Sequence, residues 1–184
     1  VSKSVVLDQF SFQVSDWNND SSNILEKISK TFHNTRVVVR SSAKSEDAFT
    51  QSNAGAYTSI LDVDPKNGLR EAITEVINSY HDCQSDDQVL VQPMLRNISL
   101  SGVAFTCSLE EGAPFYIVNY DESGSTEGIT SGTSQNHKSL YLRRDASLED
   151  LPDKILLEVM EAIQEVEIAL GYDALDVEFA QDKS

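Results

Sequence analysis

The fold is decided by residues 88–106, QVLVQPMLRNISLSGVAFT, where two apolar runs are separated by turn-forming residues. The runs 88–94 and 100–106 are short and apolar, as expected of strands. A third run of the same kind follows at 115–121. Strands this close together in the chain most simply form antiparallel hairpins or a meander.

Three segments on either side of these strands have the apolar spacing of amphipathic helices. The first follows a turn-rich cluster at 16–22, and Ser22 is expected to cap it. The third is expected to begin at Pro152 and to stop at Gly171. The core-facing positions expected are Ile24, Leu25, Ile28 and Phe32 in the first helix, Leu69, Ile73, Val76, Ile77 and Tyr80 in the second, and Ile155, Leu156, Val159, Ile163, Val166 and Leu170 in the third.

Further strands are expected at 35–40 and 57–63, at 139–144, and at 174–180 near the end of the chain. Residues 123–134, SGSTEGITSGTS, hold too much Gly, Ser and Thr for a strand and are expected to form an ordered loop. Strands gather in the middle of the chain and helices flank them. The order predicts an α+β fold, a mostly antiparallel sheet flanked by helices, instead of repeating βαβ units.

The charge of the chain disfavours nucleic acids as partners. A net charge of -16 and a pI near 4.4 disfavour binding to DNA or RNA, whose phosphate backbones such a surface repels. No apolar run approaches the ~20 residues that span a bilayer, so no membrane contact is expected. Two cysteines without metal-type spacing fit a reduced, cytoplasmic protein.

One arginine stands out in this acidic chain. Arg40 ends a valine run at 37–40 and precedes Ser41, Ser42 and a long polar segment that closes on Gly55. A guanidinium can hold phosphate oxygens in a bidentate manner, and the serines add donors. The alternative is a salt bridge from Arg40 to Glu46 or Asp47. Gly55 can either admit a ligand close to the backbone or simply permit a tight turn.

Two carboxylates lie near the other end of the sequence. Asp176 and Glu178 are two residues apart on an expected strand, so both point to one face, while Leu175, Val177 and Phe179 point to the core. Such oxygen ligands suit Mg²⁺, which takes one or two protein carboxylates together with substrate phosphates. The alternative is a solvated acidic face.

A strand end at Gln92 and Pro93 offers backbone groups to an adenine and an amide to ribose or phosphate, or it is an ordinary strand that stops at a proline. The glycines of 121–132 match no strict phosphate-loop fingerprint. None of the three histidines lies in a catalytic or ligand motif, so covalent hydrolase chemistry has no support.

Taken in order, VRSSAKSED…SNAG, TSILDV, VLVQPML, SGVAFT, NYDESGSTEGITSG and LDVEFA resemble the ATP-binding domain of pyruvate phosphate dikinase and phosphoenolpyruvate synthase. Rifampicin phosphotransferases share this domain. The resemblance runs over about residues 36–180 and implies an ATP-grasp-like fold in which two α+β lobes clamp ATP and Mg²⁺. The full enzymes of the family pass a phosphoryl group of ATP to a histidine on a separate domain and then to a small acceptor.

The resemblance also implies roles for individual residues. Arg40 corresponds to the catalytic arginine that holds the phosphates, and Glu178 to a metal-linked glutamate with Asp176 beside it. The ATP-binding residues implied are Arg40, Gly55, Ser59, Gln92, Pro93 and Glu178, and the metal ligands are Glu178 and Asp176.

Some parts of the family pattern are missing from this sequence. It has no GGK-type segment with a phosphate-gripping lysine, no LQ-x-RP tail, and no phosphohistidine motif. Residues 1–184 are therefore expected to form a partial nucleotide-binding domain of a longer phosphotransferase, with phosphohistidine and acceptor-binding domains as partners. The alternative is a non-catalytic homologue that acts as a nucleotide-binding or interaction module. A different ATP-grasp ligase is disfavoured because the R-S-S-A and D-x-E motifs indicate the dikinase group.

Overall fold

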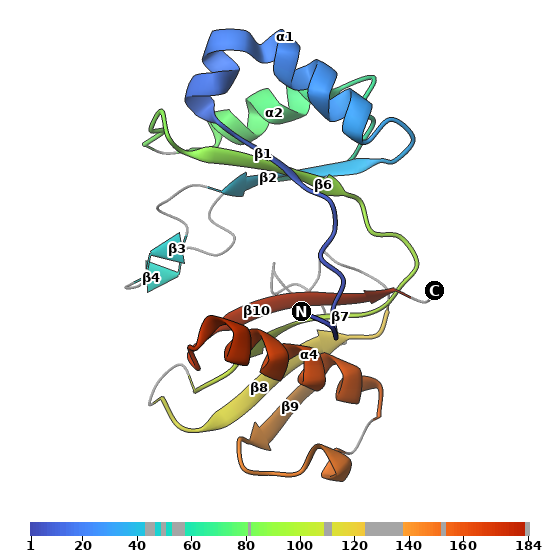
Figure 1. Cartoon of the computed structure of the whole chain (residues 1–184), viewed down its shortest axis with the longest axis vertical. Helices are drawn as coiled ribbons and strands as arrows, with labels where there is room; N and C mark the ends of the chain where they lie inside the picture. The colour runs from blue at the N-terminus through green and yellow to red at the C-terminus, as the bar shows by residue number, and fades with distance from the viewer. Residues whose placement is uncertain are drawn as a thin grey trace. The chain divides into compact units, whose positions relative to one another are not determined.

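The computed structural model describes residues 1–42, 47–48, 51–52, 58–80, 82–108, 112–123, 138–151 and 154–182. The chain divides into two compact units (Figure 1). The N-terminal unit is Leu7–Met94, and the C-terminal unit is Leu95–Ser184 together with Val1–Val6. The chain therefore passes from one unit to the other twice, at residues 6–7 and 94–95.

The N-terminal unit is a four-stranded antiparallel sheet with two helices on one of its faces (Figure 1). The strand order is β1-β6-β2-β5. A separate pair, β3 and β4, consists of two residues in each strand. The bounds are β1 Phe10–Gln13, α1 Val14–Thr31, β2 Val37–Ser42, β3 Asp47–Ala48, β4 Gln51–Ser52, β5 Ser59–Val63, α2 Leu69–Asn78 and β6 Gln88–Pro93.

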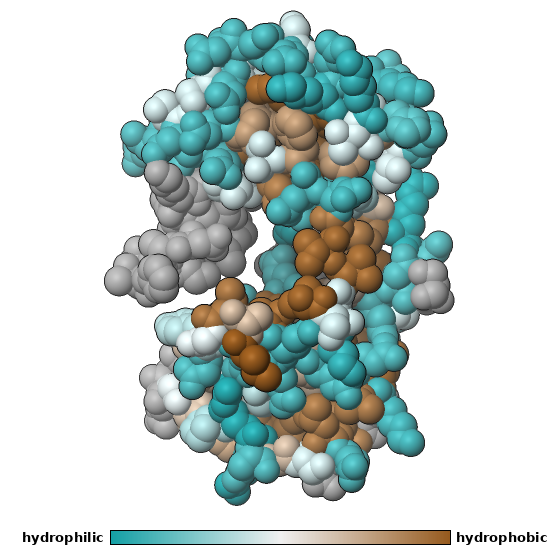
Figure 2. Space-filling view, viewed as in Figure 1, coloured by the Kyte–Doolittle hydropathy of each residue, from teal (hydrophilic) through white to brown (hydrophobic). Residues whose placement is uncertain are grey.

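Alternation along the two central strands gives this sheet one buried face. Val37 and Val39 of β2, and Val89 and Val91 of β6, are fully buried against α1 and α2. The residues between them are half-buried on the opposite face. Over α1 and α2, at the top of Figure 2, the outer surface is mostly hydrophilic, as expected of amphipathic helices that bury one side.

Helix α1 contains a break at Asp20, which the sequence analysis did not predict. Asp20 has non-helical dihedral angles (φ -151°, ψ 71°), and its Oδ1 atom accepts a hydrogen bond from the Asn23 amide at 3.1 Å. This is the geometry of a helix cap. The expected cap at Ser22 is therefore wrong, because Asp20 caps the second half of a helix that already begins at Val14.

The C-terminal unit is a second antiparallel sheet, in the order β10-β7-β8-β9, with α4 packed on one face (Figure 1). Its first residues, Ser2 and Lys3, belong to it because their backbone amides donate to the Glu165 carboxylate of α4 at 2.5 and 2.8 Å. The bounds are β7 Ile98–Phe105, β8 Phe115–Asp121, β9 Lys138–Arg143, the 3-10 helix η1 Leu148–Asp150, α4 Ile155–Leu170 and β10 Asp176–Asp182.

The buried stripe of α4 differs from the expected one at its end. Leu156, Met160 and Ile163 are buried as the core of this unit. The next core-facing position is Glu167, which is 7% exposed, whereas Leu170 is 63% exposed. Leu170 was therefore wrongly expected in the core, because the helix ends in an ion pair involving Glu167 and not in an apolar contact.

The α+β arrangement agrees with the sequence analysis, which did not expect β1. One pairing was wrong: the strand at 88–94 does not join the meander of the next two strands, since β6 lies in the other sheet between β1 and β2. The expected stop of α4 at Gly171 is confirmed by its left-handed φ of 64°. Pro152 and residues 124–134 of the expected loop lie outside the described residues.

Among the helices of the described residues, none combines the length and the apolar character needed to cross a bilayer.

Gly102 is required by close packing within the second sheet. A Cβ atom at this position would lie 2.3 Å from the Asn119 carbonyl oxygen and 2.6 Å from Cζ of Phe179. We expect Gly102→Ala to lower the free energy of unfolding by about 3 kcal/mol through overpacking. The measurement is urea unfolding followed by far-UV circular dichroism, because the single tryptophan, Trp17, lies in the N-terminal unit.

Gly171→Ala is the matched control for Gly102→Ala. Unlike Gly102, Gly171 has a positive φ, and a Cβ there would meet nothing within 4 Å, so its cost of about 1 kcal/mol is backbone strain alone. An equal or smaller loss in Gly102→Ala than in Gly171→Ala would contradict the packing argument.

Candidate functional site

Arg40 lies on the face of the first sheet that the helices leave uncovered. In β2, Val37 and Val39 point to the core, so the alternating residue Arg40 points to the other face, where it is half-buried. Its partner across the β2–β5 ladder is Ser59, and across the β2–β6 ladder it is Leu90. The structure therefore brings Arg40 and Ser59 together on one face.

Gln92 shares this face and Pro93 does not. Gln92 is the ladder partner of Val38, and its Nε2 atom donates to Gln9 Oε1 at 3.4 Å. Pro93 is the partner of Val37, whose side chain points to the helices. Gly55 lies outside the described residues. Three of the expected nucleotide-binding residues, Arg40, Ser59 and Gln92, thus share one sheet face.

Ser79 and Tyr80, which follow α2, hydrogen-bond to the backbone just before β5 and at the end of β2, respectively. The Tyr80 hydroxyl accepts a hydrogen bond from the Ser42 amide at 3.4 Å and donates to the Gln88 carbonyl at 2.5 Å. The Ser79 hydroxyl accepts from the Thr58 amide at 3.2 Å. These contacts fix the backbone two residues beyond Arg40 and one residue before Ser59.

In the C-terminal unit, Asp176 and Glu178 also lie on the face that the helix leaves uncovered. Val177 and Phe179 alternate with them and point to α4, where Phe179 packs against the core. The exposed carboxylates at 176 and 178 therefore share one face of β10, as expected from their spacing.

Further side-chain oxygen atoms, those of Asn119 and Ser139, lie on the same face of this sheet. Glu178 pairs with Val103, Val103 with Asn119, and Asn119 with Ser139, so these four residues form one row. Asn119 Oδ1 accepts a hydrogen bond from the Ser139 hydroxyl at 2.6 Å. The described residues contain no group of three or more His, Cys, Asp or Glu side chains that could hold a metal. A pair of carboxylates fits Mg²⁺, which needs one or two from the protein and completes its shell with water and phosphate.

Thr106 fixes the chain just before these carboxylates. Its buried hydroxyl donates to the Asp173 carbonyl and accepts from the Leu175 amide, both at 2.8 Å. Its own amide donates to the Leu175 carbonyl at 3.0 Å. The bonds at Leu175 set the register in which Asp176 enters the sheet opposite Phe105.

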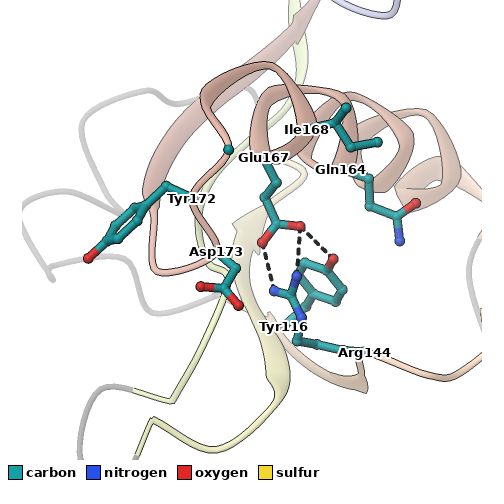
Figure 3. A pocket seen from close by; sticks show the side chains of 8 residues that line it. Tyr116, Arg144, Gln164, Glu167, Ile168, Tyr172 and Asp173 are labelled. Carbon is teal, nitrogen blue, oxygen red and sulfur yellow. Dashed lines mark hydrogen bonds and ion pairs between the residues drawn. The ribbon is translucent and has the colours of Figure 1, made fainter.

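An ion pair between Arg144 and the buried Glu167 contacts Thr106. Arg144 Nη1 donates to the Thr106 carbonyl at 2.7 Å and to Glu167 Oε1 at 2.6 Å. The Tyr116 hydroxyl donates to Glu167 Oε2 at 2.6 Å, and the Arg144 guanidinium lies 4.7 Å from the Tyr116 ring centre (Figure 3). We call Tyr116, Arg144 and Glu167 the Glu167 cluster. It satisfies a carboxylate that would otherwise be buried without a partner.

The cluster shifts the titration of its members. Burial, and then the hydrogen bond to Glu167, raise the pKa of Tyr116 to about 12. The hydrogen bond to Glu167 likewise raises the pKa of Arg144. Both shifts favour the protonation states that hold the cluster together at neutral pH.

The sequence analysis identified neither Thr106 nor the Glu167 cluster. A signal for Glu167 was present, since it follows Leu156, Met160 and Ile163 at helical spacing on the buried stripe of α4. An acid at a core-facing position predicts a buried cationic partner. The identity of that partner, 23 residues earlier in the chain, could not be read from spacing.

Residues 15–138, more than half of the chain, match the family described as the pyruvate phosphate dikinase AMP/ATP-binding domain. This is the family that the sequence motifs resemble, and that recognition is confirmed. The observed α+β fold agrees with the ATP-grasp-like class that the resemblance implied. The comparison with curated proteins found no match.

Two solved structures are similar to the chain at 12% sequence identity. One is an ATP citrate lyase from Methanosaeta concilii in complex with (3S)-citryl-CoA, with a TM-score of 0.49 over 95% of this chain and 40% of that one. The other is the D-alanyl-alanine synthetase A from Vibrio cholerae, with a TM-score of 0.46 over 96% of this chain and 46% of that one. The chain thus spans less than half the length of either protein.

Replacing Thr106 tests its role before β10. Thr106→Val keeps the shape but removes the hydroxyl, leaving the Leu175 amide without its acceptor. We expect the free energy of unfolding to fall by about 1–3 kcal/mol and hydrogen exchange at residues 173–178 to accelerate. Thr106→Ser keeps the hydroxyl and is expected to retain slow exchange there. If Val and Ser variants exchange at the same rate, the hydroxyl does not hold this segment.

The raised pKa of Tyr116 predicts a pH dependence at alkaline pH. The folded state favours the protonated phenol, so its stabilising contribution is complete below the unfolded pKa of about 10 and is lost as pH rises towards about 12. The stability difference between wild type and Tyr116→Phe should therefore shrink between these pH values. In a tyrosinate absorbance titration, Tyr116→Phe should lack a transition near pH 12 that the wild type shows. Loss of a transition near pH 10 instead would contradict the raised pKa of Tyr116.

Proposed function

Because the chain belongs to the family of pyruvate phosphate dikinase AMP/ATP-binding domains, we propose that it binds Mg·ATP as part of a dikinase-type phosphotransferase. The observation that carries the proposal is the family match over residues 15–138, which includes Arg40, Ser59 and Gln92. The proposed reaction passes a phosphoryl group of ATP to a histidine on another domain of a longer protein. Phosphoenolpyruvate synthase is the type of enzyme that the motifs resemble.

The proposed role of Arg40 is to bind the phosphates. Its guanidinium extends from β2, which is paired with a strand on each side, so the backbone position from which it reaches an anion is fixed. Ser59 lies opposite it and offers a hydroxyl at the same position on the sheet. Phosphoryl transfer needs mainly positioning and charge neutralisation, and a strand-mounted arginine supplies both.

The proposed role of Asp176 and Glu178 is to bind Mg²⁺. Both carboxylates are exposed on one face of β10, and Thr106 fixes the residues before them. The ion would neutralise charge on the phosphate oxygens during transfer. Gln92, Pro93 and Gly55 complete the proposed nucleotide site, at the adenine and ribose for the first two and at the phosphates for Gly55.

The proposed partners are the nucleotide and the phosphohistidine and acceptor-binding domains of the longer protein, in the cytoplasm. A second candidate is a non-catalytic module that binds nucleotide without transferring phosphate. A phosphohistidine formed from labelled ATP by the whole protein distinguishes the enzyme from the module.

The nucleotide site is tested by isothermal calorimetry with ATP, with Mg²⁺ and with EDTA. We expect Arg40→Ala to weaken Mg·ATP binding at least about tenfold, because a charge-assisted hydrogen bond contributes about 1.5–3 kcal/mol. Glu178→Gln, which keeps the shape but removes the charge, is expected to abolish most of the difference between the Mg²⁺ and EDTA titrations.

Two variants serve as matched controls. Arg70→Ala removes an arginine of the same unit that lies on α2 and contacts Trp17 and Ser21. Glu149→Gln removes an exposed carboxylate of η1. Both should bind Mg·ATP like the wild type. No heat of binding at millimolar nucleotide in the wild type, or equal losses in controls and site variants, would refute the proposed site.

A further inference from the structure

Among the residues that the structure describes, Arg40 and Ser59 form the last pair of the β2–β5 ladder. The next residues of β2, Ser41 and Ser42, are paired with β6 and not with β5 in the described part of the chain. The end pairs of a ladder open more readily than its central pairs. A ligand site built on Arg40 and Ser59 therefore needs contacts that hold the two strands just beyond this pair.

Tyr80 supplies such a contact on β2. Its hydroxyl accepts a hydrogen bond from the Ser42 amide at 3.4 Å and donates one to the Gln88 carbonyl at 2.5 Å. Ser42 and Gln88 are themselves the last partners of the β2–β6 ladder. One hydroxyl thus bridges two strands at the point where their pairing ends.

Ser79 supplies the corresponding contact on β5. Its hydroxyl accepts from the Thr58 amide at 3.2 Å, directly before Ser59, and donates to the Val76 carbonyl in the last turn of α2 at 2.7 Å. We call Ser79 and Tyr80 the helix-end pair. These two adjacent residues bind the backbone of both strands just outside the Arg40–Ser59 pair.

The helix end that carries these hydroxyls is firmly packed. Tyr80 is 7% exposed and belongs to the core of the N-terminal unit, in which Ile73 and Val76 of α2 are fully buried. A buried tyrosine hydroxyl needs a hydrogen-bond partner, and the Gln88 carbonyl alone meets that need. The bond from Ser42 is additional, so satisfying the tyrosine does not by itself account for it.

We propose that the helix-end pair positions Arg40 and Ser59 for phosphate binding, with Tyr80 as the positioning residue for Arg40. The inference rests on the proposed function of the same site. Tyr80 packs in the core on the helix side of the sheet, whereas Arg40 lies on the uncovered face. Its hydroxyl therefore acts on Arg40 through the backbone of β2.

The expected size of the effect follows from the opening of the ladder end. Without the Tyr80 hydroxyl, the Ser42 amide loses this acceptor and the end of β2 opens more often. The apparent dissociation constant rises in proportion as the binding-competent fraction falls. One ordinary hydrogen bond corresponds to a change of about two- to tenfold in such an equilibrium.

The test is a double-mutant cycle between Tyr80→Phe and Arg40→Ala, with Mg·ATP affinity measured by NMR titration of the labelled full chain. Tyr80→Phe keeps the ring in the core and removes the hydroxyl alone. It should weaken Mg·ATP binding about two- to tenfold when Arg40 is present, and by less than about twofold when Arg40 is already alanine. A purely structural role would affect both chains alike.

Hydrogen exchange of the free chain tests the contacts without nucleotide. The Ser42 amide should exchange faster in Tyr80→Phe, because it loses its acceptor. The Thr58 amide should exchange faster in Ser79→Ala for the same reason.

Thr74→Val is the matched control. It removes an exposed hydroxyl of α2 that donates to the Arg70 carbonyl within the helix, and it should change neither exchange nor affinity. The inference is overturned if Tyr80→Phe leaves the Ser42 amide or the affinity unchanged, or weakens binding equally with and without Arg40. These results leave the proposed function standing where the wild type binds Mg·ATP. A wild type that does not bind Mg·ATP would overturn the proposed function and the inference together.

Discussion

The C-terminal unit depends on how one buried carboxylate is neutralised. Glu167 is almost fully buried, and a carboxylate in such a place costs several kcal/mol unless it is paired and hydrogen-bonded. Arg144 and Tyr116 supply those partners, and Arg144 also binds the carbonyl of Thr106. Thr106 in turn fixes the two residues that bracket the turn into β10. The position of Asp176 and Glu178 therefore rests on an ion pair on the opposite side of the sheet.

The two units have the same layer arrangement. Each has an antiparallel sheet with helices on one face, and each leaves the other face to polar residues. Arg40, Ser59 and Gln92 occupy the uncovered face in one unit, and Asp176 and Glu178 occupy it in the other. Under the proposed function, this arrangement would let so acidic a chain bind a phosphate ligand. A single arginine held by a paired strand, and a metal held by two carboxylates, need no basic surface.

Most of the elements could be predicted from the sequence because their apolar periodicity is strong. Strand β8 was predicted with its observed bounds, and Gly171 was predicted as the end of α4. The placement of β6 could not be predicted, because strands that are neighbours in the chain need not pair, and β6 pairs with β2, which lies 46 to 56 residues earlier. That Arg40 and Ser59 share a face follows from the alternation of side chains along β2 and β5, once the pairing of these two strands is known. Thr106, Arg144 and Glu167 were missed because their contacts join residues 23 to 69 positions apart, which spacing alone does not reveal.

We propose that the chain binds a metal–nucleotide complex, with Arg40 as a phosphate ligand and Glu178 as a metal ligand. The most direct measurement replaces Mg²⁺ with paramagnetic Mn²⁺ and records the amide spectrum of the labelled chain with and without ATP. With Mn·ATP, the account predicts broadening of the resonances next to Glu178 and of those at Ser41 and Ser42, and loss of the latter in Arg40→Ala. Broadening by Mn·ATP that spares both groups, or that is unchanged in Arg40→Ala and Glu178→Gln, would contradict it.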